Sequence, residues 1–242
     1  MIMPGLENIE VFAALFSLIF VVISWILALS ILSKYFKYRV RELLLVGIAW
    51  VGIAMPWTSD AISFIMIMTI GESLNPYMKV IIELTFLPVA VILWLIAFTD
   101  LLYKNQQKLI LTIFIILGAL FEIIFFYALF TDFSLIGKYT PPLKIDYTLP
   151  IYLFLILFLG IFLITGLLMG KESLKSENKE LVLKGKFLII AFISFLIGAL
   201  LEIILPLHPV GIMLIRIILI SSAIEYYIGF TLPEFVKKIL LK

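Results

Sequence analysis

Long apolar stretches separated by short polar segments run along the whole of this 242-residue chain. Seven of them have about 20 residues or more, the length that a helix needs to cross roughly 30 Å of hydrocarbon. They lie at residues 11–33, 43–70, 77–102, 109–131, 150–170, 187–206 and 210–232. The pattern predicts an all-α membrane protein, a single seven-transmembrane helix bundle over residues 1–242 with the lipid bilayer as its surroundings.

Two details refine these spans. The second and third stretches are longer than one crossing. Tilt of the helices, or kinks near Pro56 and Pro88, would take up the excess, because proline removes a helical hydrogen bond. The last two stretches are separated only by LHPVG (207–211), which predicts a tight antiparallel hairpin.

Composition supports the membrane assignment and excludes several function classes. Hydrophobic residues make up 64% of the chain and charged residues 14%, which is more apolar than a soluble domain of this size. The net charge of +2 does not suggest nucleic acid as a partner. With no cysteine and only His208, the chain lacks the side chains for a thiolate metal site or a bis-histidine haem. We therefore expect no metal and no cofactor.

The basic residues predict the orientation. Fourteen Lys and Arg fall on one side of the predicted helices and three on the other, and basic loops stay in the cytoplasm. The pattern predicts a multi-pass protein of the cell membrane with its N-terminus outside and its C-terminus in the cytoplasm. The basic side holds Lys34, Lys37, Arg39, Arg41, Lys104, Lys108, Lys171, Lys175, Lys179, Lys184, Lys186, Lys237, Lys238 and Lys242; the other side holds Lys79, Lys138 and Lys144.

Ionisable residues inside the apolar stretches are the candidate functional residues, because burying charge in a bilayer is costly. Helical rise places four carboxylates and one arginine in a single layer nearer the outer surface. Arg216 would pair with at least one of the acids, and one or more of the others would hold protons. We predict an outward ligand-binding or proton-binding site, with purely structural hydrogen bonding between helices as the alternative. The candidates are Asp60, Glu83, Glu122, Glu202 and Arg216.

A fifth intramembrane acid, Glu225, is a separate case. Nine residues separate it from Arg216, so the two point to opposite sides of their helix. Ser221 and Ser222 share its face and complete a secondary polar patch. Local hydrogen bonding is the favoured interpretation, and a proton exit is the alternative.

One internal similarity links the fourth and sixth stretches. LGALFEIIF (117–125) matches IGALLEIIL (197–205), with a glycine and a glutamate four residues apart in each. A glycine permits close helix approach, and the carboxylate one turn later can find a partner across the contact. Duplication is one interpretation, and chance similarity between apolar helices is the other.

Two segments between the helices are candidates for contact with partners. Residues 171–186 mix both charge signs and are either a solvated linker or a cytoplasmic docking surface, a role that the C-terminal LPEFVKKILLK could also have. Residues 132–149 would lie outside, where they could cap a cavity or rest on lipid headgroups.

No catalytic motif accompanies the carboxylates, so we expect no enzyme activity and no catalytic residues. The last helix also lacks the lysine that a retinal Schiff base requires.

Three segments resemble uncharacterised archaeal seven-helix membrane proteins: GIAMPWTSDAISFI (52–65), FEIIFFYALFTDFSLIG (121–137) and GFTLPEFVKK (229–238). The layout is also loosely similar to the seven-helix input domains of histidine kinases, although these 242 residues include no kinase domain. The resemblance implies the fold and an archaeal source. We expect a sensor or receptor-like bundle that takes an external small molecule or protons, with a small secondary transporter of protons or cations as the alternative.

Overall fold

The computed structural model describes residues 8–141, 144–204 and 209–241, and these residues are almost entirely helical. Six of the described helices are long and apolar enough to cross a membrane, and a seventh span results if one bent pair counts as a single crossing. The predicted helical bundle is therefore confirmed, with a count of six to seven. The predicted tight turn at LHPVG and His208 lie largely or wholly outside the described residues.

The observed spans agree with the predicted ones to within a few residues at most ends. The first is α1 (Asn8–Tyr38), the second is the bent pair α2 (Arg41–Ile53) and α3 (Met55–Ile70), and the third combines α4 (Pro76–Leu84) with α5 (Phe86–Leu102). The remaining spans are α6 (Gln107–Thr131), α7 (Leu149–Ser173), α8 (Lys179–Ile204) and α9 (Pro209–Thr231), after which comes the short α10 (Glu234–Leu240). Single 3₁₀ turns precede and follow α6, at Lys104–Gln106 and Phe133–Leu135.

Both over-long spans are broken close to their prolines. α2 and α3 meet at Ala54 with a bend of 54°, two residues before Pro56. α4 and α5 meet at Thr85, three residues before Pro88. A proline has no N–H for the carbonyl four residues earlier, so each helix loses a hydrogen bond at its break. The predicted kink near Pro56 is confirmed, whereas at Pro88 the helix is interrupted at Thr85 within a single span.

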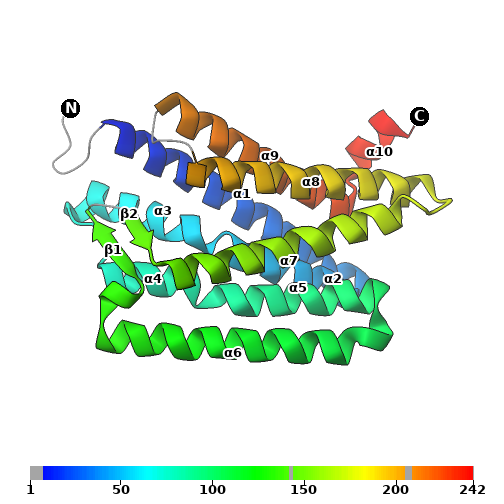
Figure 1. Ribbon diagram of the computed structural model, residues 1–242. Coiled ribbons are helices and arrows are strands. Elements are labelled where there is room, and N and C mark those ends of the chain that lie inside the picture. The colour runs from blue at the N-terminus through cyan, green and yellow to red at the C-terminus, as the bar shows by residue number, and fades with distance from the viewer. Residues whose placement is uncertain (1–7, 142–143, 205–208, 242) are drawn as a thin grey trace.

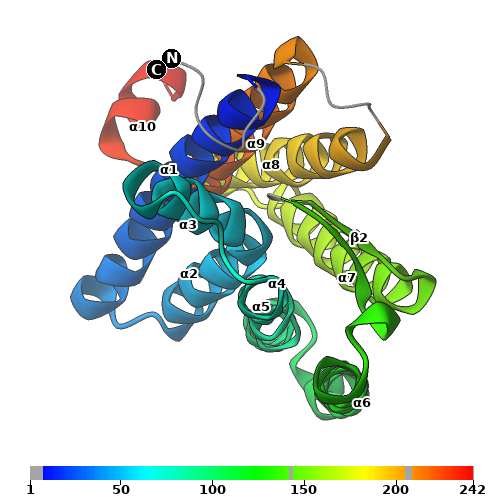
Figure 2. The same cartoon turned by 90° about the vertical axis from the view of Figure 1, so that its left-hand side faces the viewer.

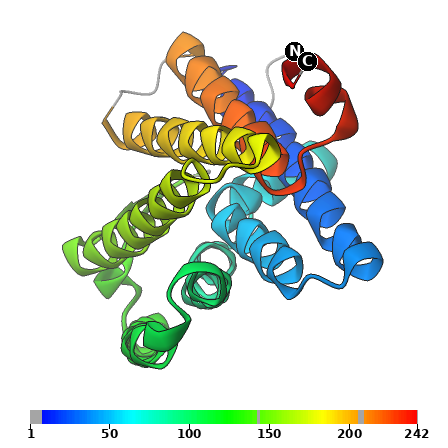
Figure 3. The ribbon, with the colours of Figure 1, turned by 90° about the vertical axis from the view of Figure 1, so that its right-hand side faces the viewer.

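Six of the spans form a closed ring, and the seventh lies outside it. Around the ring, α1 packs on α2, α2 on α5, α5 on α7, α7 on α8, α8 on α9, and α9 on α1. Figures 2 and 3 show this arrangement end-on, with α6 standing apart from the ring beside α5. Most of α6 is consequently uncovered by protein.

Aromatic side chains fill the interior of the ring. The aromatic cluster comprises Trp50 of α2, Trp94 of α5, Phe162 of α7, Phe192 and Phe195 of α8, and Tyr226 of α9, all buried. Trp50 stacks on Tyr226 with ring centroids 4.1 Å apart, and Trp94 meets Phe162 at 4.9 Å. Such contacts add to the energy of burial, so the ring has a dense, largely apolar centre.

Two predicted loops are more ordered than expected. Residues 132–149 contain a small antiparallel hairpin of β1 (Gly137–Thr140) and β2 (Lys144–Tyr147), in which Gly137 faces Tyr147. The segment 171–186 is mostly helix, because α7 continues to Ser173 and α8 begins at Lys179. Figure 1 shows the hairpin and the start of α1 at one end of the bundle and α10 at the other; we call these the hairpin end and the α10 end.

Candidate functional site

A buried lysine is the centre of the polar contacts at the hairpin end. Lys79 lies in the first turn of α4, which starts with Pro76 after the Asn75 side chain accepts a hydrogen bond from a backbone N–H. Lys79 is only 2% exposed. Its ammonium group donates a hydrogen bond to the Ser59 hydroxyl at 2.9 Å. It also forms ion pairs with Asp60, and with Glu83 at 2.8 Å. All three donor positions of the ammonium group are therefore used.

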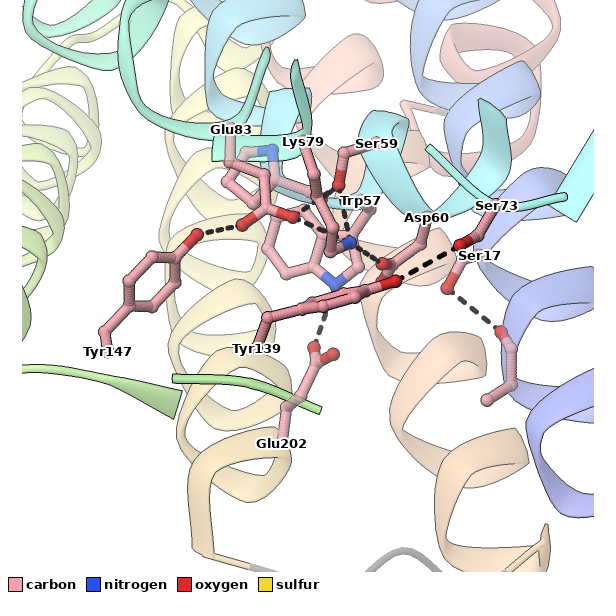
Figure 4. Close-up of polar contacts among 12 residues, drawn as sticks. Ser17, Trp57, Ser59, Asp60, Ser73, Lys79, Glu83, Tyr139, Tyr147 and Glu202 are labelled. Carbon is pink, nitrogen blue, oxygen red and sulfur yellow. Dashed lines mark hydrogen bonds and ion pairs between the residues drawn. The ribbon is translucent and has the colours of Figure 1, made fainter. Parts of the chain in front are cut away.

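The β1–β2 hairpin is hydrogen-bonded to the residues that surround Lys79. Tyr147 of β2 and Ser59 of α3 each donate a hydrogen bond to Glu83, one to each carboxylate oxygen. Tyr139 of β1 bonds the hydroxyl of Ser73 at 3.1 Å. Figure 4 shows both tyrosines reaching from the strands toward α3 and α4.

A second ion pair joins α8 and α9. Arg216 donates to Glu202 from both terminal nitrogens of its guanidinium group, with each N···O distance 2.7 Å. Its third nitrogen donates to Ser17 of α1 at 3.2 Å, and the indole N–H of Trp57 donates to Glu202 at 2.8 Å. The predicted pairing of Arg216 with at least one intramembrane acid is confirmed.

Helix α3 connects the two groups, because Trp57 contacts the Arg216 pair while Ser59 and Asp60 contact Lys79. We call the combined set the polar network: Ser17, Trp57, Ser59, Asp60, Lys79, Glu83, Tyr147, Glu202 and Arg216. All three of these α3 residues lie in its first two turns, directly after the bend between α2 and α3.

The polar network contains three carboxylates and two cations. Both cationic side chains are almost completely buried, whereas the side chains of Asp60 and Glu202 are 27% and 32% exposed. When every group is ionised the network has a net charge of −1. The negative charge is therefore accessible from the hairpin end and the positive charge is not.

Two features of the predicted charged layer are wrong. Arg216 is not its only cation, because Lys79, which we counted only with the basic residues of the outer side, is buried in the layer and paired with Asp60. Glu122 does not converge with the other acids: both of its carboxylate oxygens are buried without a hydrogen-bond partner among the described residues. The carboxylate is on α6, outside the ring, so the similarity between 117–125 and 197–205 does not extend to its contacts.

The secondary polar patch of Ser221, Ser222 and Glu225 forms hydrogen bonds within α9. Ser221 donates to Glu225 at 2.6 Å, whereas the hydroxyl of Ser222 donates to the Leu219 carbonyl at 2.7 Å. Within the described part of the chain, the second oxygen of Glu225 has no hydrogen-bond partner. The favoured interpretation as local hydrogen bonding holds for Ser221, and Ser222 does not contact the acid.

Tyr147 is the titratable group of the site that lies outside the helices. Burial raises the pKa of its phenol well above the ordinary value of 10, and the neighbouring charge of Glu83 raises it further. The phenol is thus held in its protonated, hydrogen-donating form.

Sequence reasoning missed five residues of the polar network: Lys79, Ser17, Trp57, Ser59 and Tyr147. A signal existed for the first, because Lys79 and Glu83 are four residues apart and so share a helix face. Nothing comparable marks Tyr147, whose role depends on a hairpin that the sequence pattern does not indicate.

Within residues 8–141, 144–204 and 209–241, no three His, Asp or Glu side chains are grouped so that they could hold a metal ion. Comparison of the chain with known protein families, curated proteins and solved structures gave no match.

Proposed function

We propose that this chain is a multi-pass protein of the cell membrane that senses a small cation at its outer face. The proposal takes the hairpin end as the outside, because the basic residues predict a cytoplasmic α10 end. It assigns binding and signalling to the protein, without catalysis.

The charge of the polar network supports a cationic ligand. Asp60 and Glu202 offer the only partly exposed charges of the network, and these are negative. The half-buried rings of Trp57 and Tyr139 lie beside them, and aromatic faces attract organic cations. An ammonium group would therefore find both charge compensation and aromatic contact.

The aromatic cluster is the main observation that favours a sensor over a transporter. It fills the ring between the polar network and the α10 end with closely spaced buried rings. A site with one accessible side suits a receptor, whereas a carrier must open to both sides. Trp57 also provides a link, because it bonds Glu202 and packs edge-on against Phe195 of the cluster with centroids 5.9 Å apart.

The α10 end offers a place for the signal to leave the bundle. Lys237 of α10 forms an ion pair with Glu180 at the start of α8, at 3.0 Å. A movement of α8 would thus be passed to α10, where a cytoplasmic signalling partner could detect it at the C-terminus or at the remaining linker between α7 and α8.

The test measures thermal unfolding of the purified protein with added methylammonium, ethanolamine, choline or spermidine, against sodium chloride of equal ionic strength. A specific cation at about 100 times its Kd should stabilise the fold by roughly 2.7 kcal/mol. Asp60→Asn should abolish the effect, while Asp146→Asn, an exposed acid in the same hairpin end, should retain it. No stabilisation by any cation, or equal stabilisation in both variants, contradicts the proposal.

The alternative of a secondary transporter also has a specific observation in its favour. Two broken spans line the polar network, and discontinuous helices commonly form transporter sites. The same protein in liposomes should then move protons or the stabilising cation, and Glu202→Gln should stop that flux. Stabilisation without flux supports the sensor, and flux supports the transporter.

A further inference from the structure

Glu122 is a half-buried acid that does not belong to the polar network. It lies on α6, the span outside the ring, with both carboxylate oxygens buried. The next two side chains, Ile123 and Ile124, are 65% and 48% exposed on the outer face of the helix. The acid therefore occupies the inner edge of a helix whose other surface contacts lipid.

No charge in the described part of the chain compensates Glu122. Of the ionisable groups on elements packed against α6, Asp100 of α5 is paired with Lys104 and Gln107 at the α10 end. Asp132 caps the 3₁₀ turn after α6, and the ring of Tyr152 of α7 packs on Tyr147. An ionised carboxylate without a cation is strongly disfavoured in such a place, so the neutral acid is the form that the site accommodates.

The packing of α6 on α5 shows what surrounds the acid. Gly118 faces Pro88, since a Cβ at the glycine would lie 3.2 Å from the proline Cβ. The two helices run antiparallel, as Figure 1 shows. One turn further along α6, Glu122 therefore lies level with Leu84 and Thr85, one turn earlier along the other span.

That level is where the third span is broken. Pro88 has no N–H to offer the Leu84 carbonyl, and the buried Thr85 hydroxyl has no hydrogen-bond partner among the described residues. A protonated carboxyl group has one O–H donor and a free acceptor. It can therefore supply an acceptor for the Thr85 hydroxyl and a donor for the carbonyl that Pro88 cannot serve.

We propose that Glu122 is a proton-binding site, separate from the polar network, at the break between α4 and α5. The acid lies on α6, the helix with the most exposed surface, and is uncharged, so it is also a site for modification by an apolar carbodiimide that enters from the bilayer. In that reaction the carboxyl proton moves to a carbodiimide nitrogen, a carboxylate oxygen adds to the central carbon, and acyl transfer to nitrogen leaves a stable N-acylurea.

The experiment treats the protein in liposomes with dicyclohexylcarbodiimide and locates the adduct by peptide mass spectrometry. Glu202 is the internal control, because it follows a glycine by four residues in the matching segment but is ion-paired with Arg216. We expect at least about tenfold more adduct at Glu122 than at the ion-paired Glu202, and less adduct as the pH is raised. Equal modification of the two acids, or none at Glu122, overturns the proposal.

An infrared measurement tests the same proton without a reagent. The C=O stretching band of a protonated carboxylic acid should be present in the wild type and should lose intensity in Glu122→Gln, whereas Glu202→Gln should leave the band unchanged. A band that is the same in wild type and Glu122→Gln shows that Glu122 carries no proton and overturns the proposal.

Discussion

Lys79 shows how a single side chain can unite several elements. Its ammonium group is held by α3 through Ser59 and Asp60 and by its own helix through Glu83, which in turn binds the hairpin. Burying a cation is favourable only when opposite charges and hydrogen bonds surround it. The lysine and its acids therefore stabilise the structure as a set.

We predict that Lys79→Met destabilises the protein by about 3–5 kcal/mol, because it leaves two acids without their cation. The matched control is Lys138→Met, which removes an exposed lysine from β1 at the same end and should change the stability by less than about 0.5 kcal/mol. Unfolding in denaturant should separate the two variants clearly. Equal stability of the two variants would show that the ion pairs of Lys79 make no net contribution to the free energy of unfolding.

Tyr147 gives a prediction for alkaline pH. Its pKa is raised well above 10 in the folded protein, whereas an unfolded chain releases the phenol proton near pH 10. Above about pH 10 the unfolded state thus binds fewer protons than the folded state, and stability should fall as the pH rises. Tyr147→Phe should flatten this decline, measured as the unfolding midpoint between about pH 9 and 11. Identical slopes in the two proteins would contradict the assignment.

At the residue scale, the sequence indicated the acids better than their partners. Arg216 and Glu202 could be matched by depth, since α8 ends and α9 begins at the same end of the bundle and helical rise is constant. Lys79, near the start of the predicted span 77–102, was counted only with the basic residues of the outer side, because helix ends are the least certain part of any such interpretation. Glu122 was misplaced because depth does not reveal which neighbour a helix face meets.

At the scale of elements, glycines mark where helices touch. Gly166 of α7 packs directly on the ring of Phe192 in α8, so a Cβ there would lie 2.3 Å from ring carbons. Gly160 of the same helix has nothing within 4 Å of such an atom. Both glycines lie within α7, so the two positions differ in whether a side chain of another helix packs against them.

We predict that Gly166→Ala destabilises the protein by about 1–3 kcal/mol, because the aromatic cluster has no room for another methyl group. Gly160→Ala should be neutral or stabilising by up to about 1 kcal/mol, since alanine favours the helix. Thermal unfolding of the two variants in parallel provides the comparison. A harmless Gly166→Ala would mean that α7 and α8 are less closely packed than described.

The broken spans were predictable from proline chemistry, and the hairpin was not. Pro56 and Pro88 each remove one hydrogen bond wherever the rest of the chain lies. The strands β1 and β2 have only four residues each, too few for a periodic pattern to be recognised. Their position depends on tyrosine contacts with α3 and α4, which are distant in sequence.

For the whole molecule, the orientation in the membrane is the most direct prediction. The chain has no cysteine, so single cysteines report one position each. An impermeant thiol reagent added to intact cells should label Glu72→Cys, exposed at the hairpin end, and leave Glu177→Cys between α7 and α8 unlabelled until the cells are opened. The reverse pattern would invert the topology.

The order of helices around the ring lay beyond sequence reasoning. Apolar periodicity identifies spans, but all faces of these helices are apolar because lipid and protein interior have similar polarity. Nothing in α6 therefore indicated that it stands outside the ring. The contacts of Gly118 and Glu122 follow from that position.

The hydrogen bond between Trp57 and Glu202 gives the protein a natural optical signal. Indole emission depends on its hydrogen bonds and nearby charges, and this indole donates to a carboxylate that is partly open to solvent. Trp50 and Trp94 are enclosed in the aromatic cluster, and Trp25 is on α1 away from these contacts. The difference between the emission spectra of the wild type and Trp57→Phe should thus isolate the fluorescence of one indole. Occupancy of the site can then be followed in unlabelled protein as a shift of that emission.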